Sequence, residues 1–104
     1  MKKQDVLSAL AALGQETRLD VFRRLVQAGA PGLAAGQLAT SLSISPATLS
    51  FHLKELRNAR LVTSERQGRS IRYAPNFAVI AAVVGYLGEN CCRDVAREPA
   101  RSRG

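Results

Sequence analysis

The chain has 104 residues, 46% of them hydrophobic, and its 15 Lys and Arg against 8 Asp and Glu give a formal net charge of +7. This length limits it to one domain, which buries only about two-thirds of its unfolded surface, so we expect marginal stability unless a partner subunit covers apolar surface. The positive charge favours a phosphate-bearing partner such as nucleic acid, although charge alone leaves a ribosomal or membrane surface open.

The N-terminal quarter predicts two amphipathic helices. The first runs from Asp5 to about Leu13 and ends at Gly14, and the second runs from Glu16 to about Ala28. The apolar residues that define their inner faces are Val6, Leu7, Leu10 and Leu13 in the first, and Leu19, Phe22, Leu25 and Val26 in the second. Polar residues interrupt any signal-like run, and no apolar stretch reaches the ~18 residues of a membrane span. We therefore expect a cytoplasmic protein with no membrane partner.

A third helix from about Ala34 to Leu42 and a fourth helix beginning at Pro46 are separated by a turn of three residues. Ser45 is a favourable N-cap, and Pro46 suits the first helical position because no hydrogen bond is lost there. The inward residues of the fourth helix are Leu49, Leu53 and Leu56, and the outward ones are Ala47, Thr48, Ser50, Phe51, Lys54 and Arg57. This pattern is typical of a helix-turn-helix that reads base edges in the major groove, with an ordinary helical hairpin as the alternative.

Two β-prone runs, 61–66 and 70–75, surround the turn Gln67-Gly68-Arg69 and predict a β-hairpin. Three arginines bracket its tip, where they could contact phosphate or the minor groove: Arg66, Arg69 and Arg72. In isolation such a tip is equally well explained as a solvated turn. Directly after a capped helix-turn-helix, it makes the expected fold mainly α with a small β-hairpin, which is a winged helix-turn-helix.

The C-terminal part predicts a last helix from Phe77 to about Glu89, followed by a polar, arginine-rich segment. We expect residues 1–92 to form the DNA-binding and dimerisation domain. Residues 93–104 are expected to be a flexible basic tail that adds nonspecific attraction to phosphate.

Cys91 and Cys92 are the two cysteines of the chain and are adjacent. Because the chain shows no export signal, we expect no structural disulfide and look instead to chemistry at sulfur. Thiolates select soft ions, and two sulfurs alone suit neither a tetrahedral zinc site nor magnesium. The open readings are a thiophilic ligand, redox sensing or an inert pair.

The sequence resembles the ArsR/SmtB family of bacterial metal- and metalloid-responsive repressors, most clearly over residues 37–73. The resemblance rests on Gln37-Leu-Ala, on the stretch from Ser45 to Leu56, on Leu61-Val, on Gly68-Arg69 and on Glu16-Thr-Arg-Leu. It implies a homodimer joined by its first and last helices, which binds duplex operator DNA and leaves it when an inducer binds. The residues that correspond to the family's DNA-contacting stretch are Ser45, Ala47, Thr48, Ser50, Phe51 and His52.

Two of these positions carry open alternatives. Phe51 stands where the family often has a polar residue, and it either touches a thymine methyl group or packs locally. His52 is the single histidine of the chain, and a hydrogen-bonding or phosphate-contacting role is favoured over a metal site.

The predicted inducer site departs from the best-known sites of the family. The third helix has no cysteine, and residues 77–90 contain no histidine. Cys91 and Cys92 resemble a vicinal pair that other members use to sense trivalent arsenicals. An organic trivalent arsenical is favoured over arsenite, because one of its three ligands is already carbon. Adjacent helical residues point about 100° apart, so chelation is expected to unwind the helix end and alter the dimer interface.

The expected protein is thus a transcriptional repressor that requires no cofactor and is released from DNA by a trivalent arsenic species. A repressor responsive to thiol redox or to another soft metal is one alternative, and a winged-helix protein-interaction module is another. No nucleotide-binding motif or nucleophile–base pair indicates an enzyme.

Overall fold

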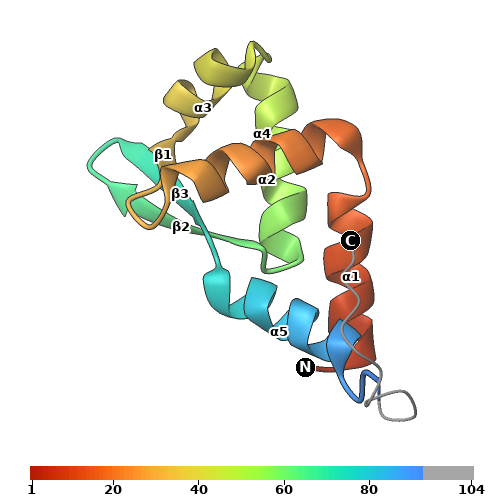
Figure 1. The fold of residues 1–104 in the computed structure, drawn as a ribbon. Helices are drawn as coiled ribbons and strands as arrows, with labels where there is room; N and C mark the ends of the chain where they lie inside the picture. The colour runs from red at the N-terminus through yellow and green to blue at the C-terminus, as the bar shows by residue number, and fades with distance from the viewer. Residues whose placement is uncertain (93–104) are drawn as a thin grey trace.

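The computed structural model describes residues 1–92 of the chain, so the predicted basic tail lies outside the described residues. Within this range five helices and three short strands follow one another (Figure 1). They are α1 (Lys3–Leu13), α2 (Glu16–Ala28), β1 (Leu33–Ala34), α3 (Ala35–Leu42), α4 (Pro46–Asn58), β2 (Val62–Gln67), β3 (Ser70–Pro75) and α5 (Phe77–Gly88). The order and type of these elements confirm the predicted winged helix-turn-helix.

The sheet contains one strand more than the predicted hairpin. Its order is β1-β3-β2 and both pairings are antiparallel, with Leu33 opposite Tyr73 and Gln67 opposite Ser70. The two-residue strand β1 follows the loop after α2 and joins the helical layer to the hairpin. In Figure 1 the turn of this hairpin projects to the left, whereas α1 and α5 lie at the right and bottom of the view.

The core lies where α2, α3, α4 and the start of β2 meet. Its most deeply buried large side chains are Val21, Leu25, Leu38, Leu49, Leu56 and Leu61. The three leucines predicted to face inward from the fourth helix are all buried. Their burial determines which side of α4 faces solvent.

The inward face of α1 differs from the prediction. Ala9 and Ala12 are buried beside Val6, whereas Leu7 and Leu10 are 50% and 42% exposed. The small alanine side chains let α1 lie close to the core, and the neighbouring stripe of leucines then points away from it. Leu19 of α2 was likewise expected inside and is instead exposed, while Val21 takes the buried position.

Replacing Ser45 with alanine is expected to destabilise the domain by about 1 kcal/mol, because α4 loses its N-cap. The Ser45 hydroxyl accepts a hydrogen bond from the Thr48 N–H at 3.1 Å. Urea unfolding followed by circular dichroism measures the change. Ser45→Asn keeps a side-chain acceptor at this position and serves as the control. An alanine variant as stable as the asparagine variant would contradict the capping role.

Candidate nucleic-acid interface

The helix-turn-helix consists of α3, the turn of residues 43–45 and α4. Ser43 adopts a left-handed conformation with φ of 56°, and the Ile44 N–H donates to the Ala39 carbonyl, which closes the end of α3. The turn is therefore as short as predicted. We define the outer face of α4 as the cap Ser45 together with six exposed residues of the helix: Ala47, Thr48, Ser50, Phe51, Lys54 and Arg57. This face offers three hydroxyls near the helix start, one aromatic ring and two cations.

The wing presents two of its three predicted arginines to solvent. Arg66 and Arg69 are exposed beside the turn, where Gly68 has φ of 63°. Arg72 is different, because its guanidinium is engaged by the protein itself. It donates from Nε to the Pro31 carbonyl at 3.1 Å and from Nη2 to the Gly32 carbonyl at 2.9 Å. The structure thus gives Arg72 the role of fastening the wing to the loop after α2, not that of a residue at the tip.

His52 also differs from its predicted place. His52 is only 7% exposed, because it lies on the inner side of α4. Its Nδ1 accepts a hydrogen bond from Nη1 of Arg18 at 3.3 Å. Burial and the Arg18 charge lower the pKa of His52 below 6.5, while Glu55 acts in the opposite direction. His52 is therefore a hydrogen-bonding residue of the interior, and we do not retain it as a DNA contact.

Arg18 is the site residue that the sequence analysis missed. It lies in the first turn of α2 and contacts both His52 and the ring of Phe51, with its guanidinium carbon 5.9 Å from the ring centroid. The only available signal was its place within the Glu16-Thr-Arg-Leu segment. Phe51 itself is 56% exposed, so its ring combines local packing with an accessible surface.

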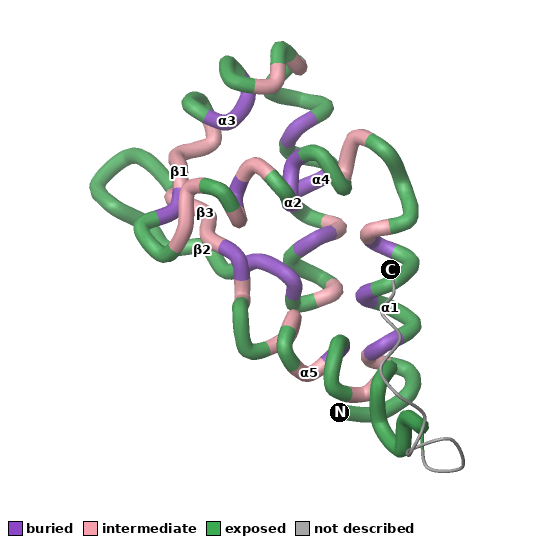
Figure 2. Tube along the Cα trace, in the orientation of Figure 1, coloured by how far each residue is buried: buried purple, intermediate pink, exposed green. Residues whose placement is uncertain are grey.

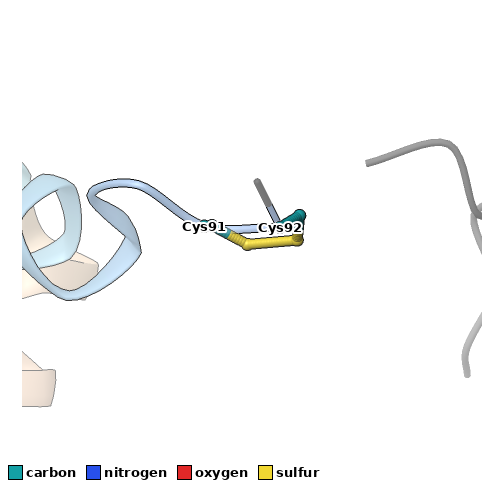
Figure 3. Close-up of a disulfide and its surroundings, with 2 residues drawn as sticks. All are labelled: Cys91 and Cys92. Carbon is teal, nitrogen blue, oxygen red and sulfur yellow. A yellow bond between two sulfur atoms is a disulfide. The ribbon is translucent and has the colours of Figure 1, made fainter. Parts of the chain in front are cut away.

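Cys91 and Cys92 lie beyond the end of α5 and are joined by a disulfide (Figure 3). The expectation of no disulfide is thus wrong. A bridge between adjacent residues nevertheless encloses no intervening chain and joins no separate elements, so it adds little to the stability of the fold. Both cysteines are exposed, and Cys92 has φ of 66°. Because α5 already ends at Gly88, the two sulfurs are brought together without any unwinding of the helix. No group of three or more His, Cys, Asp and Glu gathers among residues 1–92.

A second surface lies on α1 and α5 and is apolar. Figure 2 shows α5 as mostly exposed or half-buried along its length, with Val83 as its buried residue. We define the apolar face by the large exposed side chains of these two helices: Leu7, Leu10, Phe77, Val84 and Leu87. Helix α5 packs on α1, so the five residues come from neighbouring elements.

The exposed α4 and its adjoining hairpin define a winged helix-turn-helix protein. A helix-turn-helix domain family matches residues 13–65. The chain is 36% identical over 81 residues to the HTH-type transcriptional regulator CmtR of Mycobacterium tuberculosis. This match covers 77% of this chain and 69% of CmtR. It is 30% identical over 80 residues to the nodulation protein NolR of Rhizobium meliloti, covering 77% of this chain and 63% of NolR. The chain thus spans less than two-thirds of the length of NolR.

Solved structures agree with these sequence relatives. An ArsR-like transcriptional regulator from Rhodococcus sp. RHA1 has a TM-score of 0.72 and 33% identity, covering 81% of this chain and 76% of that one. The antimony-specific transcriptional repressor AntR has a TM-score of 0.65 and 26% identity, covering 81% and 75%. The chain therefore belongs to the ArsR-like helix-turn-helix transcriptional regulators. These relatives confirm the predicted family. They also confirm the prediction that the chain is a regulator and not an enzyme. No helix in the described part of the chain is long and apolar enough to cross a membrane.

Proposed function

We propose that this protein is a dimeric repressor that binds duplex operator DNA through the outer face of α4 and the tip of the wing. The observation that carries the proposal is the combination of Ser and Thr hydroxyls at the exposed start of α4 with arginines beside the same helix. Hydroxyls can bond several base edges, and Arg66 and Arg69 can pair with phosphates. Because the partner is operator DNA, we expect the protein to act in the cytoplasm.

The second copy is proposed to cover the apolar face of α1 and α5. A single protomer leaves Leu10 and Val84 in water on adjacent helices, and clusters of this kind mark sites of association. A two-fold pairing buries the same residues on both protomers. It also sets the spacing between the two copies of α4, which must match two half-sites of the operator.

We propose a trivalent arsenical as the inducer and the reduced pair of Cys91 and Cys92 as its site. A thiol reductant first supplies the electrons and protons that open the disulfide. Each thiol then replaces an oxygen ligand of arsenic, so that an As–S bond forms and water leaves. The likeness to AntR supports a soft group-15 ligand, because AntR is described as an antimony-specific repressor. An organic arsenical remains favoured, since it needs only two protein sulfurs.

Fluorescence anisotropy of the reduced protein on its upstream promoter duplex tests these proposals, with a scrambled duplex of equal length as control. We expect selective binding, and release by arsenite or by a trivalent methyl or phenyl arsenical through a loss of affinity of about 5- to 150-fold. Cys91→Ser and Cys92→Ser should each retain binding and lose the response. Zinc and cadmium are expected to have no effect.

Other results of the same titration would contradict parts of the proposal. Binding that is indifferent to every ligand would contradict the inducer proposal and keep the repressor. A protein without selective, salt-dependent binding would instead be an interaction module. The disulfide gives one specific reason to retain thiol redox as a second candidate function. Weaker operator binding by the oxidised protein, with no arsenical added and no such change in the serine variants, would favour it. Sedimentation of the same samples gives the oligomeric state.

A further inference from the structure

An open cleft separates α1 from α4 beside the first turn of α2. Ala12 of α1, Arg18 of α2 and Glu55 of α4 line it. Helices α1 and α4 also contact each other directly. A side chain that spans the cleft adds a further link between the two helices.

The guanidinium of Arg18 makes that bridge. Its Nε donates to the Ala12 carbonyl at 2.6 Å, and its Nη1 donates to Nδ1 of His52 at 3.3 Å. Ala12 lies in the last turn of α1, where backbone carbonyls have no partner within the helix. The planar, multidentate guanidinium holds both acceptors in a fixed geometry, which a lysine ammonium does not reproduce. The backbone N–H of Arg18 in turn donates to the side chain of Gln15 at 2.8 Å, which anchors this turn of α2.

The same guanidinium lies against Phe51 on the outer face of α4. Its distance of 5.9 Å from the ring centroid is within the range of a cation–π contact. The His52 ring packs edge-on with the Phe51 ring, with centroids 5.3 Å apart and an interplanar angle of 66°. Arg18 and His52 together therefore restrict the orientation of a ring that remains largely exposed to the partner.

We infer that Arg18 is a positioning residue for DNA recognition, which ties the end of α1 to α4 and orients Phe51 toward a thymine methyl group. This inference rests on the proposed DNA binding. Arg18 need not touch DNA, because it acts through His52 and Phe51. It also connects α1, a helix of the proposed dimer interface, to the helix that reads the bases.

The DNA-free part of the test uses His52, the single histidine of the chain, as an NMR probe of the bridge. The guanidinium can only donate, so Nδ1 must be an unprotonated acceptor. The charged groups that act on this ring are Arg18 from α2 and Glu55 from α4. We expect Arg18→Gln to raise the pKa of His52 and to shift the Phe51 ring resonances. The matched control is Arg23→Gln, which removes an exposed arginine from the same helix and should change neither signal.

The DNA part compares the operator duplex with one in which thymines are replaced by uracil, which lacks the methyl group. We expect the wild type and Arg23→Gln to prefer thymine, and Arg18→Gln to lose about two- to tenfold of that preference. Phe51→Ala should lose the same preference, and the double variant should lose no more than either single variant. Arg18→Lys, which keeps the charge, should not restore the thymine preference.

Two results overturn the inference in different ways. An unchanged His52 titration together with unchanged Phe51 resonances in Arg18→Gln would show that Arg18 does not contact these two side chains, whatever the DNA measurements give. A thymine preference retained in a folded Arg18→Gln would remove its role in recognition. If Arg18→Gln does not fold, His52→Phe tests the same bridge, because it keeps an aromatic ring beside Phe51 but removes the acceptor for Arg18, and it should lose the thymine preference. Failure of the wild type to bind operator DNA selectively would instead reject the proposed function and, with it, this role in recognition.

Discussion

Leu56→Ala is expected to lower the free energy of unfolding by roughly 2–5 kcal/mol, which is a large part of the stability of a domain of this size. Leu56 is completely buried on the inner face of α4, and its backbone carbonyl accepts the Leu61 N–H at 2.9 Å where the helix gives way to the wing. Truncation leaves a cavity beneath the helix that carries the outer face. DNA affinity is therefore expected to fall together with stability.

Urea denaturation and operator anisotropy on the same preparation measure the two effects of Leu56→Ala. The matched control is Leu19→Ala, which makes the same chemical change on an exposed position of α2. This control should cost no more than about 0.5 kcal/mol, since it removes little buried surface. Similar losses for the two variants would show that Leu56 does not support the core as described.

Gly32→Ala is the second change for which a large loss is expected, of more than about 2 kcal/mol. Gly32 has φ of 72°, and a Cβ there would overlap the carbonyl oxygen of Tyr73 on β3. The strand β1 must then move away from β3. The Gly32 carbonyl would move with it, so that Arg72 loses an acceptor and the wing loses part of its attachment.

Thermal unfolding of variants at two other glycines separates the two causes of this loss, which are the backbone conformation and the overlap with β3. Gly68 has φ of 63° and open space around it, so Gly68→Ala carries the backbone cost alone, about 1 kcal/mol. Gly36 lies in α3 with no atom near the added Cβ, and Gly36→Ala should stabilise by up to about 1 kcal/mol. A Gly32 variant no less stable than the Gly68 variant would show that the close approach to β3 can relax.

The sequence was most informative where neighbouring residues determine the structure. Helix α2 has the predicted bounds, because an amphipathic pattern lies between Gly14 and the breakers that follow Ala28. Helix α4 begins where Ser45 and Pro46 predict, since a cap and an N1 proline act within one turn. The same locality explains the correct hairpin turn and the exposure of most of the predicted DNA-contacting residues.

Contacts between distant segments were the part that local patterns did not predict. His52 and Arg18 are 34 positions apart, and Arg72 and Gly32 are 40 positions apart. A histidine next to outward-facing residues of a helix gives no local sign that an arginine of another helix will hold it inside. Strand β1 has only two residues, so it shows no alternation that could reveal it.

Helix α1 was ambiguous for a different reason. It carries two apolar stripes side by side, one of valine and alanine and one of leucine. Periodicity identifies both, but it does not say which one faces the helix's own core. The prediction was right for Val6 and Leu13, which pack on the core, and wrong for Leu7 and Leu10. In the structure the compact stripe packs inside, and these two leucines are left for the surface that we propose a second copy covers.

This division of α1 links protein concentration to folding. If the leucine stripe is covered only in the dimer, separated protomers lose both the buried surface that stabilises α1 and the paired geometry needed for two half-sites. Falling repressor levels would then reduce operator occupancy by mass action and expose more chains to proteolysis at the same time. The decline of repression on dilution would be steeper than the affinity for DNA alone implies.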